Sequence, residues 1–189
     1  MNTKKIAKIA GISLAIILIS LFSVMGVIIY DVMSYTANGF ETFSAEGNVT
    51  GNALVVYAPG ISGQSSNAAL NIAKELQNKG YNVDLVGINN AKAKNTSIYE
   101  LIIVGGPIYA GKASSSVQAY LNNLKPSKGT KIAVFATGSD KDVMKNSKLL
   151  RSEVAPLNNS NSFKIDAVGK FVSGENNNHG IVAFVGSFI

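Results

Sequence analysis

The chain has 189 residues, a formal net charge of +6, no cysteine and a single histidine, His179. The absence of cysteine excludes disulfides, thiolate metal centres and cysteine nucleophiles, and one histidine cannot build a histidine-rich metal site, so we expect no metal. This length accommodates one domain of ordinary size and an additional segment.

The additional segment is an apolar stretch near the N-terminus. Residues 9–30 contain no charged side chain and consist mainly of Ile, Leu, Val, Ala and Ser. As a helix, this stretch spans roughly 33 Å, which is close to the hydrocarbon thickness of a bilayer. A signal peptide is the alternative, but its apolar region is usually only about 7–15 residues long. We therefore predict a retained transmembrane helix over residues 9–30.

Charged residues flank this helix asymmetrically. The tail of residues 1–8 contains three lysines, whereas the charges that follow the helix are acidic, beginning with Asp31. The positive-inside rule then places the N-terminus in the cytoplasm and the rest of a single-pass protein outside the cell membrane. Residues 31–52 mix Ser, Thr, Gly, Asn and Glu without a period, and we predict that they tether the helix to a domain over residues 53–189.

The predicted domain begins with a strand, a tight turn and a helix. Residues 54–57 form an apolar run typical of a strand that is buried on both faces. From Ser65 onward the apolar residues recur with helical spacing, and between the two elements lie small residues that carry hydroxyl or amide groups. Glycine lets a backbone turn sharply, and the first N–H groups of a helix lack internal partners. Such a turn is suited to hold an anion, most often a phosphate.

Three other interpretations of this turn are open. A dinucleotide-binding fingerprint requires G-x-G-x-x-G, whereas the turn contains only Gly60 and Gly63. The nucleophile elbow of a serine hydrolase requires G-x-S-x-G, and Gln64 replaces its closing glycine. An ordinary strand–helix connection with a serine cap is the third. The remainder of the chain favours phosphate binding.

Strand and helix patterns alternate after the turn, which indicates an α/β fold with a parallel sheet covered on both faces. Four further strands are predicted at residues 81–86, 100–104, 132–136 and 163–171, with helices near 117–124 and 142–154. The first, third and fourth strands are almost wholly apolar, whereas the second and fifth alternate between polar and apolar residues. Because fully apolar strands belong in the middle of a parallel sheet, we predict a doubly wound five-stranded sheet of order 2-1-3-4-5.

This strand order predicts the position of a ligand. A ligand of such a sheet binds beyond the carboxyl ends of strands one, three and four. The connections at these ends are residues 59–66, 106–112 and 137–140, and all three are rich in glycine and small polar residues. The position and the composition of these connections therefore both predict a ligand site built from three loops.

The three loops resemble those of the flavodoxin family. Residues 62–65 (SGQS) are similar to the T-G-x-T phosphate loop of the family. Residues 101–112 (LIIVGGPIYAGK) resemble the third strand and following loop of flavodoxin-domain proteins, including the protoporphyrinogen-oxidase-like branch. Residues 135–140 (FATGSD) are similar to the loop after the fourth strand. The resemblance covers residues 53 to 171 and implies a flavodoxin-like fold with FMN as the cofactor.

By this resemblance, the first loop holds the phosphate of FMN and the other two lie around its ring. The implied phosphate-binding residues are Ser62, Gly63, Gln64, Ser65 and Ser66, and Gly60 and Ile61 of the same loop also belong to the implied cofactor site. Tyr109 would lie against the isoalloxazine ring, whose edges would be lined by Pro107, Ile108, Ala110 and Gly111, and by Thr137, Gly138, Ser139 and Asp140. The resemblance implies electron transfer or flavin-dependent reduction, and no residue stands out as a catalytic acid or base.

Other functions compete with this interpretation. Residues 106–113 nearly spell a nucleotide-binding P-loop, but Ala113 replaces the hydroxyl residue that ligates magnesium. A domain that has lost flavin and binds a partner outside the cell is a second alternative, favoured by Gly60 at a position that usually carries a hydroxyl. A third is a hydrolase in which Ser62, Asp166 and His179 follow one another in Ser-Asp-His order.

The net positive charge indicates which classes of partner the protein would bind. It favours acidic proteins or anionic lipid headgroups. We expect the membrane as one partner, a redox protein or a small-molecule electron acceptor as another, and no nucleic acid.

Overall fold

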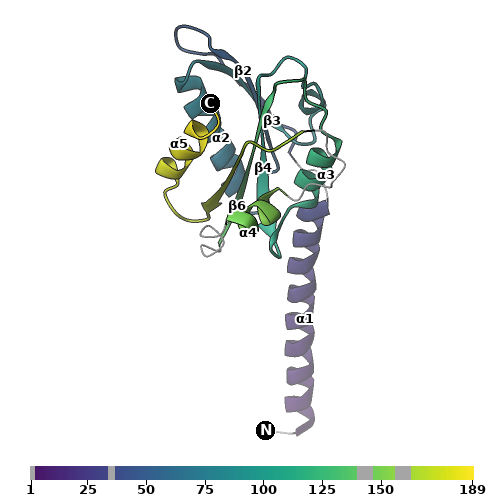
Figure 1. The fold of residues 1–189 in the computed structure, drawn as a ribbon. Coiled ribbons are helices and arrows are strands. Elements are labelled where there is room, and N and C mark those ends of the chain that lie inside the picture. The colour runs from purple at the N-terminus through teal and green to yellow at the C-terminus, as the bar shows by residue number, and fades with distance from the viewer. Residues whose placement is uncertain (1–2, 34–36, 140–146, 156–162) are drawn as a thin grey trace.

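The computed structural model describes residues 3–33, 37–139, 147–155 and 163–189. It contains a long N-terminal helix, α1 (Thr3–Met33), and an α/β domain in which helices cover both faces of a central sheet (Figure 1). The strands are β1 (Phe40–Phe43), β2 (Gly51–Tyr57), β3 (Tyr81–Gly87), β4 (Leu101–Tyr109), β5 (Lys112–Ala113), β6 (Lys131–Gly138) and β7 (Ala167–Val172). The helices of the domain are α2 (Gln64–Asn78), α3 (Ser115–Asn123), α4 (Ser147–Val154), α5 (Asn178–Gly186) and a 3₁₀ turn, η1 (Ala91–Lys94).

The strand order confirms the predicted winding. The parallel strands follow one another as β3-β2-β4-β6-β7, which is the order 2-1-3-4-5 of the predicted strands. The middle strands β2, β4 and β6 are buried along most of their length, because helices cover both faces there. The sheet is larger than predicted, since β1 extends it at the β3 edge and β5 pairs with β4 in a hairpin.

The two faces of the sheet have separate apolar cores, because neighbouring residues of a strand point to opposite sides. Val55, Ile103 and Phe135 pack with α2 and α5 on one face. Ile102 and Val134 pack with α3 and the end of α4 on the other. The central strands are therefore held from both sides, and they fix the loops at their carboxyl ends.

The prediction of a tether over residues 31–52 is wrong in its middle. Residues 40–43 form β1, which pairs antiparallel with β3. The pairing continues outside the strand, because the N–H of Gly87 donates to the carbonyl of Gly39 and the N–H of Asn89 to that of Ala37. The sequence FETF is short and mostly exposed, so it shows no alternating pattern that would predict a strand.

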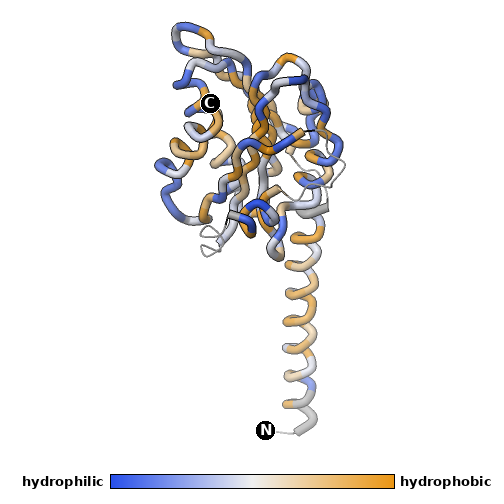
Figure 2. The backbone as a smooth tube through the Cα atoms, viewed as in Figure 1, coloured by the Kyte–Doolittle hydropathy of each residue, from blue (hydrophilic) through white to orange (hydrophobic). Residues whose placement is uncertain are grey.

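Apolar residues predominate along α1 (Figure 2), and the large ones between Ile6 and Tyr30 are mostly exposed. Phe22, for example, is 75% exposed. The stretch Lys8–Tyr30 has a mean hydropathy of 2.8 and is long enough to cross a membrane. Its length, composition and N-terminal position are compatible with a membrane span or with a signal sequence.

The C-terminal part of the domain differs from the sequence-based expectation in detail. The strand predicted from residue 163 begins only at Ala167. The helix predicted from residue 142 is described from Ser147, and residues 142–146 lie outside the described part of the chain. No state was predicted for the last residues, which form α5 and bury Phe184 against Phe171, with ring centroids 5.8 Å apart.

Candidate functional site

The three predicted loops meet at the carboxyl edge of the sheet, because β2, β4 and β6 are adjacent. The N–H of Ile61 in the first loop donates to the Tyr109 hydroxyl of the second, over 3.3 Å. A Cβ atom on Gly60 would lie 3.2 Å from the Pro107 ring, so these loops also pack directly. The first loop reaches the third through Ser65 and Thr137, whose hydroxyl oxygens are 2.5 Å apart.

The first loop leaves backbone donors available at the start of α2. Gly60 and Gly63 have φ angles of 69° and 70°, a conformation that suits glycine. Within the described residues, the N–H groups of Ser65 and Ser66 have no protein acceptor, whereas that of Asn67 bonds to Gly63. The N–H of Gln64 makes only a long contact of 3.5 Å with the exposed Ser62 hydroxyl. These donors fit an anion such as a phosphate group.

Ser65 has a different role from the one that the resemblance implies. Its side chain is 1% exposed, and its hydroxyl bonds to Thr137, which is also buried. The hydroxyl therefore ties α2 to the end of β6, and among the polar groups of Ser65 the backbone N–H is the one without a protein acceptor within the described residues. Ser62 is the exposed hydroxyl of this loop.

The second loop is a tight hairpin between β4 and β5. Tyr109 pairs with Lys112, which leaves Ala110 and Gly111 as a two-residue turn. Their φ angles are 49° and 75°, as a type I′ turn requires. Alanine rarely adopts this conformation, which costs an L-residue roughly 1–2 kcal/mol. The turn also rules out the P-loop alternative, because residues 106–109 belong to a strand instead of a loop before a helix.

The remaining predicted residues divide between the edge of the core and the surface. Pro107 is buried, and Ile108 and Tyr109 are partly buried. At the end of β6, Gly138 is partly buried and Ser139 is exposed. Asp140, which the resemblance also implicates, lies outside the described residues.

The structure separates the residues of the alternative hydrolase triad. Ser62 lies at the carboxyl edge of the sheet, whereas Asp166 lies at the amino edge, where its carboxylate accepts the N–H of Ile132 near the start of β6. The eight residues of β6 span roughly 26 Å at about 3.3 Å per residue, so the two side chains cannot meet. His179 is exposed near the start of α5.

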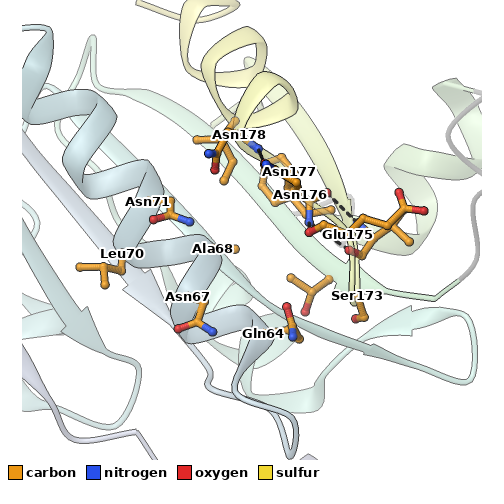
Figure 3. Close-up of a pocket in the computed structure, with 14 residues that line it drawn as sticks. Gln64, Asn67, Ala68, Leu70, Asn71, Ser173, Glu175, Asn176, Asn177 and Asn178 are labelled. Carbon is orange, nitrogen blue, oxygen red and sulfur yellow. Dashed lines mark hydrogen bonds between the residues drawn. The ribbon is translucent and has the colours of Figure 1, made fainter.

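A pocket of about 340 Å³ lies beside the first and third loops, between α2 and the connection from β7 to α5 (Figure 3). It shares Gln64 and Thr137 with the site described above. Figure 3 shows Gln64, Asn67 and Asn71 along α2, opposite Asn178 and its neighbours. Asparagine is frequent along the whole chain, so the sequence held no signal for this pocket.

A family model and a solved structure agree on the fold. A family model described as a flavodoxin domain matches residues 54–172. Oxidised Flavodoxin 2 from Bacillus cereus has 17% identity and a TM-score of 0.50, over 72% of this chain and 96% of that chain. A flavodoxin from the domain Archaea has 14% identity and a TM-score of 0.45, over 71% and 93%.

The other comparisons add less. The metal-soaked Flv1 flavodiiron core from Synechocystis has 18% identity and a TM-score of 0.48, and the match covers 72% of this chain but only 34% of that chain. A search of curated proteins found no match.

Proposed function

The chain belongs to the flavodoxin-domain family, and from this premise we propose that its three loops bind FMN and that it exchanges electrons through this cofactor. One observation carries the proposal. The N–H groups of Ser65 and Ser66, at the start of α2, lack protein acceptors within the described residues, and the bonds Ile61–Tyr109 and Ser65–Thr137 join this loop to the other two. This arrangement fits the phosphate group of FMN.

The residues of the chain would bind and orient the cofactor, and FMN would supply the redox chemistry. Ser62, with the N–H groups of Ser65 and Ser66, would hold the phosphate. The hydrogen bond from Ile61 to Tyr109 joins the phosphate loop to the β4–β5 hairpin and would keep the two parts of the site in register. The turn at Ala110–Gly111 and the end of β6 would lie along the ring.

The connection of α1 to the domain would determine which part of the domain faces a membrane in which α1 is anchored. α1 ends at Met33, and Ala37 bonds to Asn89, just beyond the end of β3. Four residues span at most about 14 Å, so a membrane-anchored α1 would hold this edge of the sheet close to the bilayer. β3 ends at the same edge as the candidate loops, since it runs parallel to β2. Figure 1 shows α1 leaving the domain below α3.

We accordingly propose a single-pass membrane protein whose redox partner lies in or at the same membrane. The lysines of the N-terminal tail favour a cytoplasmic N-terminus and an extracytoplasmic domain. Protease added to intact cells tests this topology. We expect cleavage of the domain in intact cells, whereas cleavage only after lysis would place the domain in the cytoplasm.

Titration with FMN and riboflavin tests the proposed cofactor. The purified full-length protein in detergent should bind FMN more tightly than riboflavin, because only FMN carries the phosphate. A hydrogen bond to a charged group is worth about 1.5–3 kcal/mol, so Ser62→Ala should weaken FMN binding by roughly tenfold or more. Riboflavin affinity should change little. Ser97→Ala, at an exposed serine before the amino end of β4 and thus at the opposite edge of the sheet, is the matched control.

The outcomes of this titration are distinct. Equal affinities for FMN and riboflavin would contradict the phosphate site. No binding of either flavin would favour the alternative of a domain that has lost its cofactor and binds a partner. Ser65→Ala should lower the stability of the fold without changing the preference for FMN, because its hydroxyl bonds to Thr137.

A further inference from the structure

Lys170 places a buried ammonium group next to the candidate site. Its side chain is 1% exposed, and its Nζ lies 3.1 Å from Oε2 of Glu153 in α4. The Glu153 side chain is 16% exposed. Within the described residues, this carboxylate is the acceptor that the structure provides for Lys170. The ammonium group is thus almost entirely removed from water, and the carboxylate is largely so.

The ion pair lies beneath two of the three loops. A Cβ atom on Gly138, at the end of β6, would be 3.4 Å from Cε of Lys170 and 3.6 Å from Cβ of Ile108. A Cβ atom on Gly111, in the hairpin turn, would be 3.9 Å from Oε1 of Glu153. Lys170 therefore approaches the end of β6, and Glu153 approaches the β4–β5 hairpin. These two segments are the ones assigned to the edges of the flavin ring.

Stability alone does not explain a buried ion pair at this position. Removing two charges from water is costly, and well-packed apolar residues of similar size are often as stable or more stable. Neighbouring residues in this core, such as Val154 of α4 and Ala136 of β6, are apolar and buried. An apolar pair in place of Lys170 and Glu153 would therefore fit the core.

We propose that Lys170 and Glu153 are positioning residues whose charges set the reduction potential of FMN bound at the three loops. This inference rests on the proposed function. Two-electron reduction of FMN with uptake of one proton leaves one additional negative charge on the cofactor. The positive Lys170 favours that charge and the negative Glu153 opposes it, and such effects are strong where water is excluded.

The test is the midpoint potential of FMN in the full-length protein, measured by reduction with dithionite against a reference dye. In Lys170→Met, the ratio of the affinity for reduced FMN to that for oxidised FMN should fall about tenfold. This change corresponds to a shift of roughly −30 mV in the midpoint potential of a two-electron couple. Glu153→Gln should shift the potential upward by a similar amount. The double variant should return close to the parent, because both charges are absent.

Two comparisons separate the charge effect from damage to the fold. Lys164 and Asp166 form an ion pair of the same length, 3.1 Å, at the opposite edge of the sheet, so Lys164→Met should leave the potential unchanged. If Lys170→Met fails to fold, Glu153→Gln is compared with the double variant, since these two differ only at residue 170. The double variant should then have the lower potential.

The results that overturn the inference are specific. FMN binding with unchanged potentials in both single variants, or shifts of the same sign, would overturn it and leave the proposed function intact. Equal potentials in Glu153→Gln and the double variant would do the same. Failure of the parent to bind FMN would overturn the proposed function, and this inference with it.

Discussion

The two edges of the sheet use polar groups in opposite ways. At the amino edge, carboxylates accept hydrogen bonds from backbone N–H groups near the points where strands begin. Glu100 accepts the N–H of Asn52 over 2.6 Å, and Asp166 accepts that of Ile132 over 2.9 Å. At the carboxyl edge, within the described residues, the N–H groups of Ser65 and Ser66 have no such acceptor. At the amino edge the protein itself supplies acceptors for these N–H groups, whereas at the carboxyl edge we infer that a ligand supplies them.

The comparison shows that residue type does not reveal the role of a side chain. Asp166 follows Ser62 in the chain order of a hydrolase triad, but its carboxylate accepts a backbone N–H at the amino edge. Ser65 belongs to the motif that resembles a phosphate loop, but its hydroxyl is buried against Thr137. What distinguishes these residues is whether the fold already supplies a hydrogen-bond partner.

The largest effect is expected in β4, the strand that joins the two edges at the centre of the sheet. A Cβ atom on Gly105 would lie 2.3 Å from the ring of Phe135, a fully buried side chain on the adjacent strand. Gly105→Ala should therefore lower the free energy of unfolding by about 3 kcal/mol, because the ring must move within a packed core. Urea unfolding measures the change.

Gly186→Ala is the matched control for this substitution. A Cβ atom there meets nothing within 4 Å, and the residue lies in α5. Alanine favours a helix over glycine by about 0.5–1 kcal/mol, so this variant should be unchanged or slightly more stable. Similar losses in both variants would contradict the packing argument for Gly105.

Much of this architecture could be predicted from the sequence. The apolar runs in the central strands and the alternating pattern in the outer ones gave the correct order, because helices bury both faces of the middle of a parallel sheet. The positions of the three loops followed from that order. β1 was missed, since residues 40–43 are too few and too exposed to show a period.

The roles of individual side chains were harder to predict. Lys170 lies in the alternating segment 163–171, where a lysine suggests a solvent-facing position, but α4 and Glu153 cover it. The resemblance of residues 62–65 to the phosphate loop of the family assigns Ser65 to the ligand. The partner of the Ser65 hydroxyl, Thr137, is distant in the sequence, and only the adjacency of β2, β4 and β6 brings the two together.

The second prediction concerns the amino edge. Burial opposes the charged form of Asp166, but the hydrogen bond from Ile132 and the nearby Lys164 outweigh it and hold the pKa of this carboxyl below its usual range. A group with a lowered pKa in the folded state stabilises the protein above its unfolded pKa, about 3.9 for Asp, and this contribution disappears as the pH falls through the folded pKa.

Asp166→Asn should therefore cost roughly 1–2 kcal/mol at neutral pH, because a hydrogen bond to a charged acceptor is replaced by one to a neutral amide. Urea unfolding at several pH values should show the difference from the parent shrinking below about pH 4. FMN affinity should remain that of the parent. A difference that is constant with pH would show that the charge of Asp166 does not contribute.

The smallest expected effect is at the carboxyl edge, in the hairpin turn. Ala110 has a φ of 49°, which glycine adopts at little cost. Ala110→Gly relieves the strain of this conformation but gives the unfolded chain more freedom, so we expect a net gain of about 0.5 kcal/mol in unfolding free energy. Ala91→Gly, at an exposed alanine in η1 without a positive φ, should lose a similar amount.

The same pair of variants shows whether the strain at Ala110 serves the site. If the turn only connects β4 to β5, Ala110→Gly should bind FMN as the parent does and be slightly more stable. If alanine is retained to restrict the hairpin beside the flavin, the variant should be more stable but bind FMN less tightly, because a flexible turn must be ordered on binding. Equal losses of stability in both glycine variants would show that Ala110 is not strained.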